Sequence, residues 1–151
     1  MNTLKSYSCI ISSDVACICK TVKEVLGYLQ DAYGDMEESA VFEIKVILNE
    51  LLVNAVKHGN KGLIDKCVKV NVGITKNDEV FVIVEDEGEG FEYSRSCPCE
   101  RSQNAPEGID ILDETGRGIF IVKNLCERVK FNEKGNKVVV LKKISKECDR
   151  S

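Results

Sequence analysis

Residues 49–59, NELLVNAVKHG, are the stretch that decides the predicted fold. Apolar residues recur three and four positions apart through this stretch and the residues before it, which predicts a helix with one face in a core. Glu50, Asn54 and His58 are four residues apart and share another face, each about 6 Å further along the axis. A carboxylate and an amide that point in one direction suit a hard cation such as Mg²⁺, or a hydroxyl that needs a base; the alternative is a solvated polar face.

Strand-like and helix-like patterns alternate around this helix. Asp35 is predicted to open the helix, with Glu37 and Glu38 in its first turn, where acids stabilise the helix dipole. The other predicted elements are a strand over 4–11, a helix from a cap at residues 12–14 to Tyr33, a hairpin over 66–85, a short helix after Gly118 and a hairpin over 127–144. This order predicts an α+β fold of one domain, residues 1–151, with helices on one face of a mixed, mostly antiparallel sheet.

Asp86, Gly88 and Gly90 form an Asp-x-Gly-x-Gly motif directly after a predicted strand. The strand would place Asp86 at the edge of the sheet, and the glycines would let the backbone approach a ligand closely. A carboxylate there can accept a hydrogen bond from an exocyclic amine, although a simple turn explains the motif equally well. The motif is neither a P-loop nor a dinucleotide fingerprint, because it is followed neither by Gly-Lys-Ser/Thr nor by a helix.

Residues 114–120, ETGRGIF, place two glycines before a predicted helix. The free backbone N–H groups at a helix N-terminus are a binding site for phosphate, and Arg117 adds a positive charge. The alternative is a simple helix entry without a ligand.

The net charge of −4 comes from one segment, residues 92–115. This segment holds six acids, two bases and both prolines, which leaves 19 acids and 19 bases elsewhere. A loop of this length is functional or disordered. The overall balance of 21 Lys and Arg against 25 Asp and Glu argues against a dedicated nucleic-acid binder, and the apolar content of 43% excludes a collagenous or wholly disordered chain.

Eight cysteines are fewer than a disulfide scaffold needs, so we expect reduced thiols. No apolar run is long enough for a signal peptide core or a membrane span, so we expect a cytoplasmic protein. The pairs Cys17/Cys19 and Cys97/Cys99 lack the spacing of a zinc ribbon or a thioredoxin motif. A metal or redox site at Cys97 and Cys99 is the alternative.

In this order and at these distances, the three motifs resemble those of the GHKL ATPases, which include gyrase and the histidine kinases. Residues 50–59 resemble the asparagine box of that family, and the two later motifs resemble its two glycine boxes. The small size and the Gly-Arg-Gly-Ile-Phe at 116–120 are similar to the bacterial anti-sigma factor serine/threonine kinases. The resemblance covers residues 5–144 and implies a two-layer α/β sandwich, the Bergerat ATP-binding fold.

The resemblance also implies a role for each motif residue. Glu50 takes the general-base position and accepts the proton of a protein Ser or Thr hydroxyl as it attacks the γ-phosphate. Asn54 coordinates Mg²⁺, Asp86 accepts a hydrogen bond from the adenine amine, and residues 92–115 become the ATP lid. The other implied ATP-binding residues are His58, Gly88, Gly90, Thr115, Gly116, Arg117, Gly118 and Ile119. For His58 and its neighbour Lys57, capping of the helix end is the alternative.

Gly135-Asn136 departs from the pattern of this family, in which Gly-Thr opens the last strand and the Thr helps to hold adenine. Asparagine can still donate and accept hydrogen bonds, so we expect nucleotide binding to survive the change. The acids of residues 92–115 would repel a triphosphate, so we expect them to face solvent or a partner when the lid closes.

As a whole, the resemblance implies a serine/threonine-protein kinase that uses ATP and Mg²⁺ and is also an anti-sigma factor. Its partners would be a sigma factor, which it sequesters, and a STAS-type anti-anti-sigma protein, which it phosphorylates. A homodimer formed through the sheet face and the first strand is implied as well, with no membrane or nucleic-acid partner. One alternative is a non-catalytic module in which ATP only gates a protein interface. A detached histidine kinase catalytic domain is disfavoured, because the only histidine lies inside the asparagine box.

Overall fold

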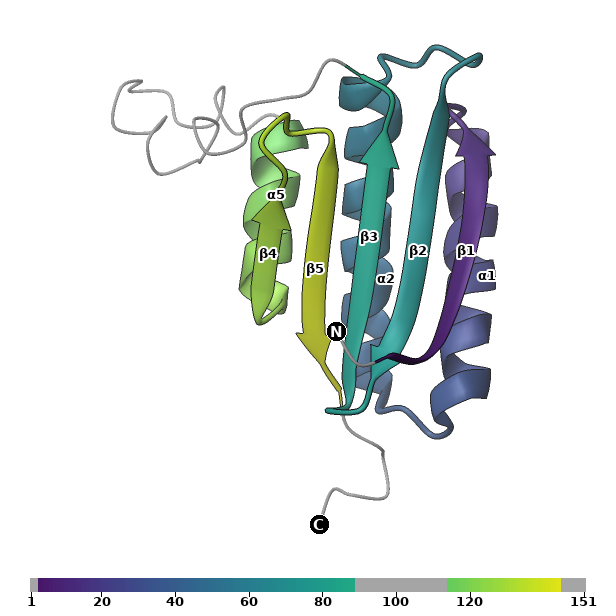
Figure 1. The fold of residues 1–151 in the computed structure, drawn as a ribbon, viewed down its shortest axis with the longest axis vertical. Helices are drawn as coiled ribbons and strands as arrows, with labels where there is room; N and C mark the ends of the chain where they lie inside the picture. Colours follow the sequence, from purple (N-terminus) through teal and green to yellow (C-terminus); the bar gives the residue numbers. More distant parts are fainter. Residues whose placement is uncertain (1–2, 89–113, 145–151) are drawn as a thin grey trace, which may run out of the picture.

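The part of the chain that the structure describes forms one open sheet of five strands, with three α-helices on one of its faces (Figure 1). The computed structural model describes residues 3–88 and 114–144, with side chains over 6–88 and 118–144. The strands are β1 (Thr3–Ser12), β2 (Cys67–Thr75), β3 (Glu79–Asp86), β4 (Arg128–Phe131) and β5 (Lys137–Lys143). Their order is β1-β2-β3-β5-β4, and all four pairings are antiparallel, which confirms the predicted α+β fold.

The sheet face toward the helices is apolar, because alternate residues of each strand point to it. Val70 of β2 pairs with Val84 of β3, and Val72 pairs with Val82. All four valines are buried in one core with residues of the helices. Burial of each such side chain contributes about 1.5–3 kcal/mol, so the period-two pattern over 66–85 carries much of the stability of the sheet.

Helix α1 (Ala16–Tyr33) begins and ends close to the predicted residues. The Asp14 carboxylate accepts a hydrogen bond from the Ala16 N–H at 3.0 Å, which supplies one of the donors at the helix start with a partner. Gly34 ends the helix with φ +98°, a conformation that glycine adopts at low cost, and its N–H donates to the Gln30 carbonyl.

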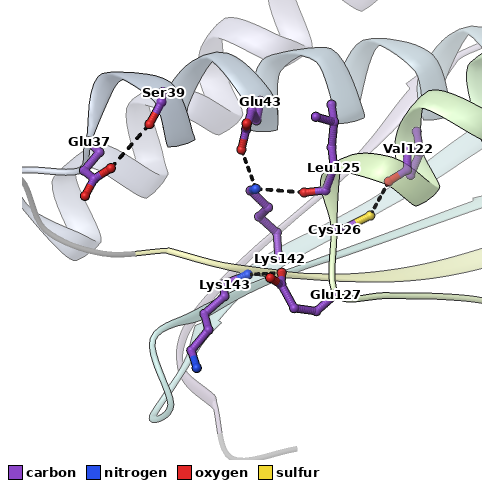
Figure 2. Close-up of polar contacts among 9 residues, drawn as sticks. All are labelled: Glu37, Ser39, Glu43, Val122, Leu125, Cys126, Glu127, Lys142 and Lys143. Carbon is purple, nitrogen blue, oxygen red and sulfur yellow. Dashed lines mark hydrogen bonds and ion pairs between the residues drawn. The ribbon is translucent and has the colours of Figure 1, made fainter.

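Helix α2 (Glu38–Val53) begins three residues later than predicted. Glu37 has an extended backbone, φ −56° and ψ 141°, so only Glu38 lies in the first helical turn. The Ser39 hydroxyl donates to the Glu37 carboxylate at 3.3 Å, a side-chain bond that keeps Glu37 at the entry of the helix (Figure 2). The three residues 35–37 thus connect the two helices instead of extending α2.

A π-helical turn, η1 (Asn54–Gly59), continues α2 to Gly59. The Asn60 N–H donates to the Ala55 carbonyl, five residues back, at 2.8 Å. A π turn takes more residues than an α turn, and such turns occur frequently at functional sites. The widening begins at Asn54, the residue for which the sequence predicts a ligand.

Helix α5 (Glu114–Leu125) begins five residues earlier than predicted, so Gly116 and Gly118 lie inside its first turns and not before it. Glycine lowers helix propensity but does not forbid the helix. The predicted final hairpin is confirmed as β4 and β5, joined through Gly135 with φ +84°.

A partly buried polar cluster ties the end of α5 to α2 and β5 (Figure 2). The Lys142 ammonium forms an ion pair with Glu43 of α2 and donates to the Leu125 carbonyl at 2.7 Å. The side chain of Lys142 is 12% exposed. The bond to Leu125 satisfies one of the carbonyls that a helix C-terminus leaves without an intrahelical partner.

Several predictions fall on residues that the structure does not describe: Gly90, Cys97, Cys99 and nearly all of the predicted lid at 92–115. Within the described residues, no helix has the length and apolar character that crossing a membrane requires. The five described cysteines are free thiols. Burial raises the pKa of the Cys126 thiol to about 11, and this thiol donates to the Val122 carbonyl (Figure 2).

Candidate functional site

A small pocket lies between the helix layer and the sheet, where β3 ends. Asn54 and Ala55 of η1 line one side, and Ile119 of α5 lines another. Asp86 and Asn136 line the sheet side. The asparagine box and the first glycine box, which lie about 30 residues apart in the sequence, therefore face one pocket.

Asp86 is the buried carboxylate of this pocket, with 6% of the residue exposed. Burial raises the pKa of Asp86, while the Gly88 N–H, which donates to the carboxylate at 2.8 Å, acts in the opposite direction. A carboxylate in this setting accepts hydrogen bonds and discriminates against groups that cannot donate one.

Gly59 and Gly88 let the two motif segments touch at Asp86. A Cβ atom on Gly59 would overlap the Asp86 carboxylate, and a Cβ atom on Gly88 would overlap the Gly59 carbonyl. Both positions therefore require glycine, because two segments of the chain approach each other closely there. Close approach of a ligand to the Gly-x-Gly motif stays a prediction.

Asn54 is almost fully buried, at 3% exposed, and both polar atoms of its amide lack a hydrogen-bond partner in the described structure. A buried amide without partners costs free energy, so a partner such as a ligand, an ion or an ordered water is expected beside it. The amide oxygen is a suitable donor atom for Mg²⁺, and the amide N–H groups suit phosphate oxygens. The residues present therefore fit a magnesium–phosphate ligand with Asn54 as its protein anchor.

Glu50 lies next to Asn54 at the point where α2 meets α5. A Cβ atom built on Gly118 would overlap the Glu50 carboxylate and lie 3.7 Å from Asn54 Nδ2. The two side chains predicted as base and metal ligand thus converge on one glycine of the second glycine box. Because α5 begins at Glu114, its first four N–H groups, of residues 114–117, lack intrahelical acceptors and form a site that suits anions.

His58 is not among the described residues that line the pocket, although it was predicted on the same helix face as Asn54. Because a step of four residues covers more than one α turn but less than one π turn, the π turn places His58 differently relative to Asn54 than a regular helix would. Ile119 lines the pocket, and its binding of ATP stays a prediction. Thr115, Gly116 and Arg117 lie in the first turns of α5, where only the backbone is described.

Asn60 lies beside the site but outside the three sequence motifs. It is fully buried, and its side chain accepts from the Glu87 N–H at 2.8 Å and donates to Ser13 Oγ and the Cys67 carbonyl. These bonds fix the end of η1 to the loop after β3 and to the start of β2. An asparagine directly after His-Gly is the only sequence signal, and it gives no indication of partners so far along the chain.

Comparison with known proteins agrees with this geometry. Residues 15–142 match the histidine kinase-like ATPase domain family. The serine-protein kinase RsbW of Staphylococcus epidermidis is 30% identical over 143 residues, which cover 91% of this chain and 84% of that protein. RsbW of Staphylococcus aureus strain MRSA252 is 29% identical over 144 residues, with the same coverage.

Among solved structures, the histidine kinase domain of the blue-light activated histidine kinase EL346 from Erythrobacter litoralis superposes with a TM-score of 0.46 at 18% identity. The superposition covers 84% of this chain and 57% of that one. The match to the family extends over most of the described residues, and the chain therefore belongs to the histidine kinase-like ATPase family, in the group of the serine-protein kinase RsbW.

Proposed function

We propose that this protein is an ATP- and Mg²⁺-dependent serine/threonine-protein kinase that also acts as an anti-sigma factor. The observation that carries the proposal is the convergence of Glu50 and Asn54 on Gly118, beside the pocket that holds Asp86. The relatives named serine-protein kinase RsbW support the reaction class. We further propose that the chain works as one ATP-binding domain in the cytoplasm, with residues 92–115 as its lid.

Each site residue has a distinct task in this proposal. Asp86 accepts a hydrogen bond from the adenine amine, and Asn54 holds the magnesium ion that neutralises the phosphates. The backbone N–H groups at the start of α5 bind phosphate oxygens. Glu50 accepts the proton of the attacking Ser or Thr hydroxyl. A carboxylate of ordinary basicity suffices for this step, because phosphoryl transfer depends mainly on positioning and charge stabilisation.

The proposed substrate is a STAS-type anti-anti-sigma protein, and the proposed sequestered partner is a sigma factor. The open sheet face, opposite the helices in Figure 1, is the proposed dimer interface. Ile10 of β1 is 65% exposed there, and an apolar side chain on a strand face without a covering layer suits burial between two copies.

Transfer of labelled phosphate from ATP to STAS proteins of the same genome tests the proposal. Glu50→Gln keeps the shape of the side chain and removes the base, so transfer should fall by at least 100-fold while ATP still binds. Glu38→Gln, on the exposed first turn of the same helix, is the matched control and should transfer phosphate like the wild type.

Two results would contradict parts of the proposal. Undiminished transfer by Glu50→Gln would remove Glu50 as the base. Tight ATP binding by the wild type without transfer to any STAS protein, together with nucleotide-dependent capture of a partner, would establish the alternative, a non-catalytic module gated by ATP.

A further inference from the structure

Asn136 occupies the position at which the family resemblance predicts threonine. It forms hydrogen bonds with the main chain of Asp86. It lies between Gly135 and Lys137, the first residue of β5, and it lines the pocket beside Asp86. Its Nδ2 donates to the Asp86 carbonyl at 3.0 Å, and its own carbonyl accepts from the Asp86 N–H at 2.9 Å. Both main-chain polar groups of Asp86 are therefore engaged by one residue.

In a regular antiparallel ladder, the backbone N–H of Asn136 would donate to the Asp86 carbonyl. Here the side-chain Nδ2 of Asn136 makes this hydrogen bond instead. The paired residues of β3 and β5 end at Glu85 and Lys137. One position further, the Asn136 N–H donates to Asn132 Oδ1 at 3.1 Å and is not directed at Asp86. The Asn136 amide replaces it, so the sheet contact extends to Asp86 through a side chain.

Asn132 fixes the orientation of the Asn136 amide. Its Nδ2 donates to Asn136 Oδ1 at 2.8 Å, and its Oδ1 accepts from the N–H groups of Gly135, Asn136 and Lys137. With Oδ1 bonded to Asn132, Nδ2 is the atom of the Asn136 amide left to face Asp86. A threonine hydroxyl has one proton to donate and is one bond closer to the backbone, so it does not reproduce this pair of bonds.

The carboxylate of Asp86 depends on this anchor for its direction. Its Oδ1 accepts from the Gly88 N–H, and the neighbouring Glu87 N–H donates to Asn60 Oδ1 at 2.8 Å. Asn60 thus holds the loop from the helix side, and Asn136 holds it from the sheet side. A recognition group must be held within a fraction of an ångström to discriminate ligands that differ by one hydrogen-bond donor.

We propose that Asn136 is a positioning residue for nucleobase selection: it holds the Asp86 main chain so that the carboxylate meets the 6-amino group of a purine. The inference rests on the ATP binding of the proposed function, but it does not require phosphate transfer. Asn136 contributes by positioning Asp86, and Asn132 contributes by orienting the amide of Asn136.

The test compares the Kd values of ATP and of purine riboside triphosphate, which lacks the 6-amino group, by calorimetry on the full chain. For the wild type we expect ATP to bind about 10- to 100-fold more tightly, the range for one hydrogen bond to a charged acceptor. Asn136→Ala should weaken ATP and reduce this preference to about 3-fold or less. Equal weakening of both nucleotides, with an unchanged ratio, is the result of a merely structural role and would overturn the inference.

Two further variants keep the test valid if Asn136→Ala folds poorly. Asn136→Asp preserves side-chain size and the acceptor for Asn132 but puts an oxygen against the Asp86 carbonyl, so the ATP preference should fall as for alanine. Asn132→Asp keeps an oxygen for the three main-chain N–H groups of the turn. It should lower the preference for ATP less than Asn136→Asp does. The control is Asn77→Ala in the exposed β2–β3 turn at the opposite end of the sheet (Figure 1), which should keep the wild-type ratio.

Failure of the inference is distinguishable from failure of the proposed function. A wild type that binds both nucleotides equally, or neither of them, overturns the inference. A wild type that prefers ATP and loses the preference in Asn136→Asp, yet transfers no phosphate, supports the inference and contradicts the kinase.

Discussion

Gly118 of α5 lies so close to Glu50 of α2 that a Cβ atom on the glycine would overlap the Glu50 carboxylate. The atom in the way is the far end of a long side chain, which can rotate away at little cost in stability. The contact therefore affects the position of the Glu50 carboxylate more than it affects the free energy of unfolding.

Gly118→Ala should separate activity from stability. The new methyl group displaces the Glu50 carboxylate, so phosphate transfer should fall by at least 10-fold while the free energy of unfolding stays constant or rises by up to about 1 kcal/mol, the helix-propensity gain of alanine over glycine. Transfer assays and urea unfolding measure the two quantities.

The matched control for this substitution is Gly27→Ala. Gly27 also lies inside a helix, α1, and apart from its own helix turn no atom of the described residues lies within 4 Å of a Cβ atom built there. It should gain similar stability and keep full activity. Full activity in Gly118→Ala would show that the position of Glu50 at this contact does not matter for catalysis.

Asn54→Leu should stabilise the ligand-free protein and abolish binding of Mg²⁺–ATP. Both amide atoms of Asn54 are buried without partners, and removing such a group is worth about 1–3 kcal/mol. Chemical unfolding and calorimetry give the two results. Asn49→Leu, at an exposed position of α2, should change stability by less than about 0.5 kcal/mol. A strong loss of stability in Asn54→Leu would contradict the assignment of Asn54 as a ligand-binding group.

Acidification should weaken ATP binding at a pH above the ordinary range of an aspartate. Burial raises the pKa of Asp86. The ionised carboxylate is the stronger hydrogen-bond acceptor for the adenine amine, and protonation removes its negative charge. Calorimetry from neutral pH downward should show ATP affinity falling as Asp86 protonates, whereas purine riboside triphosphate should bind with little change through the same step. A parallel loss for both nucleotides would exclude Asp86 as the cause.

The raised pKa of Asp86 affects folding in the opposite direction: acidification should weaken ATP binding but stabilise the folded protein. Because the folded protein holds the Asp86 proton more tightly than the unfolded chain, stability is lost as pH rises through the interval between the two pKa values. Asp86→Asn removes this penalty and keeps an oxygen for the Gly88 N–H. At neutral pH the ligand-free variant should therefore unfold at an equal or higher urea concentration than the wild type, while its preference for ATP disappears.

Lys142→Met should destabilise the protein more than Glu43→Gln. The Lys142 ammonium pairs with Glu43 and donates to the Leu125 carbonyl. Its loss leaves both groups without this partner and should lower the free energy of unfolding by about 1–3 kcal/mol. Glu43 is 34% exposed and can regain water. Urea unfolding compares both variants with Lys143→Met, an exposed neighbour whose backbone N–H, not its side chain, bonds Glu127 (Figure 2). An equal effect of Lys142→Met and Lys143→Met would show that the ion pair contributes nothing.

The predicted boundaries differ from the structure where tertiary contacts outweigh local signals. Asp35 looks like a helix start, yet α2 begins at Glu38. The glycines of the second glycine box look like a helix entry, yet α5 already begins at Glu114 and contains them. At Gly118, the absence of a side chain allows close contact with Glu50 and Asn54, which lie more than 60 residues earlier in the chain.

By itself, the sequence determined the order of helices and strands, the apolar faces and the motif residues, because hydrophobic periodicity and glycine placement are local properties. The tertiary structure decided which motif residues meet. It widened the helix into a π turn from Asn54, brought Glu50 and Asn54 against Gly118, and gave Asn136 and Asn60 their contacts with the Asp86 loop. The physical reason is that a polar side chain takes its role from the partner that folding brings to it. For Asn60 and Asn136 the hydrogen-bond partner lies 27 and 50 positions away.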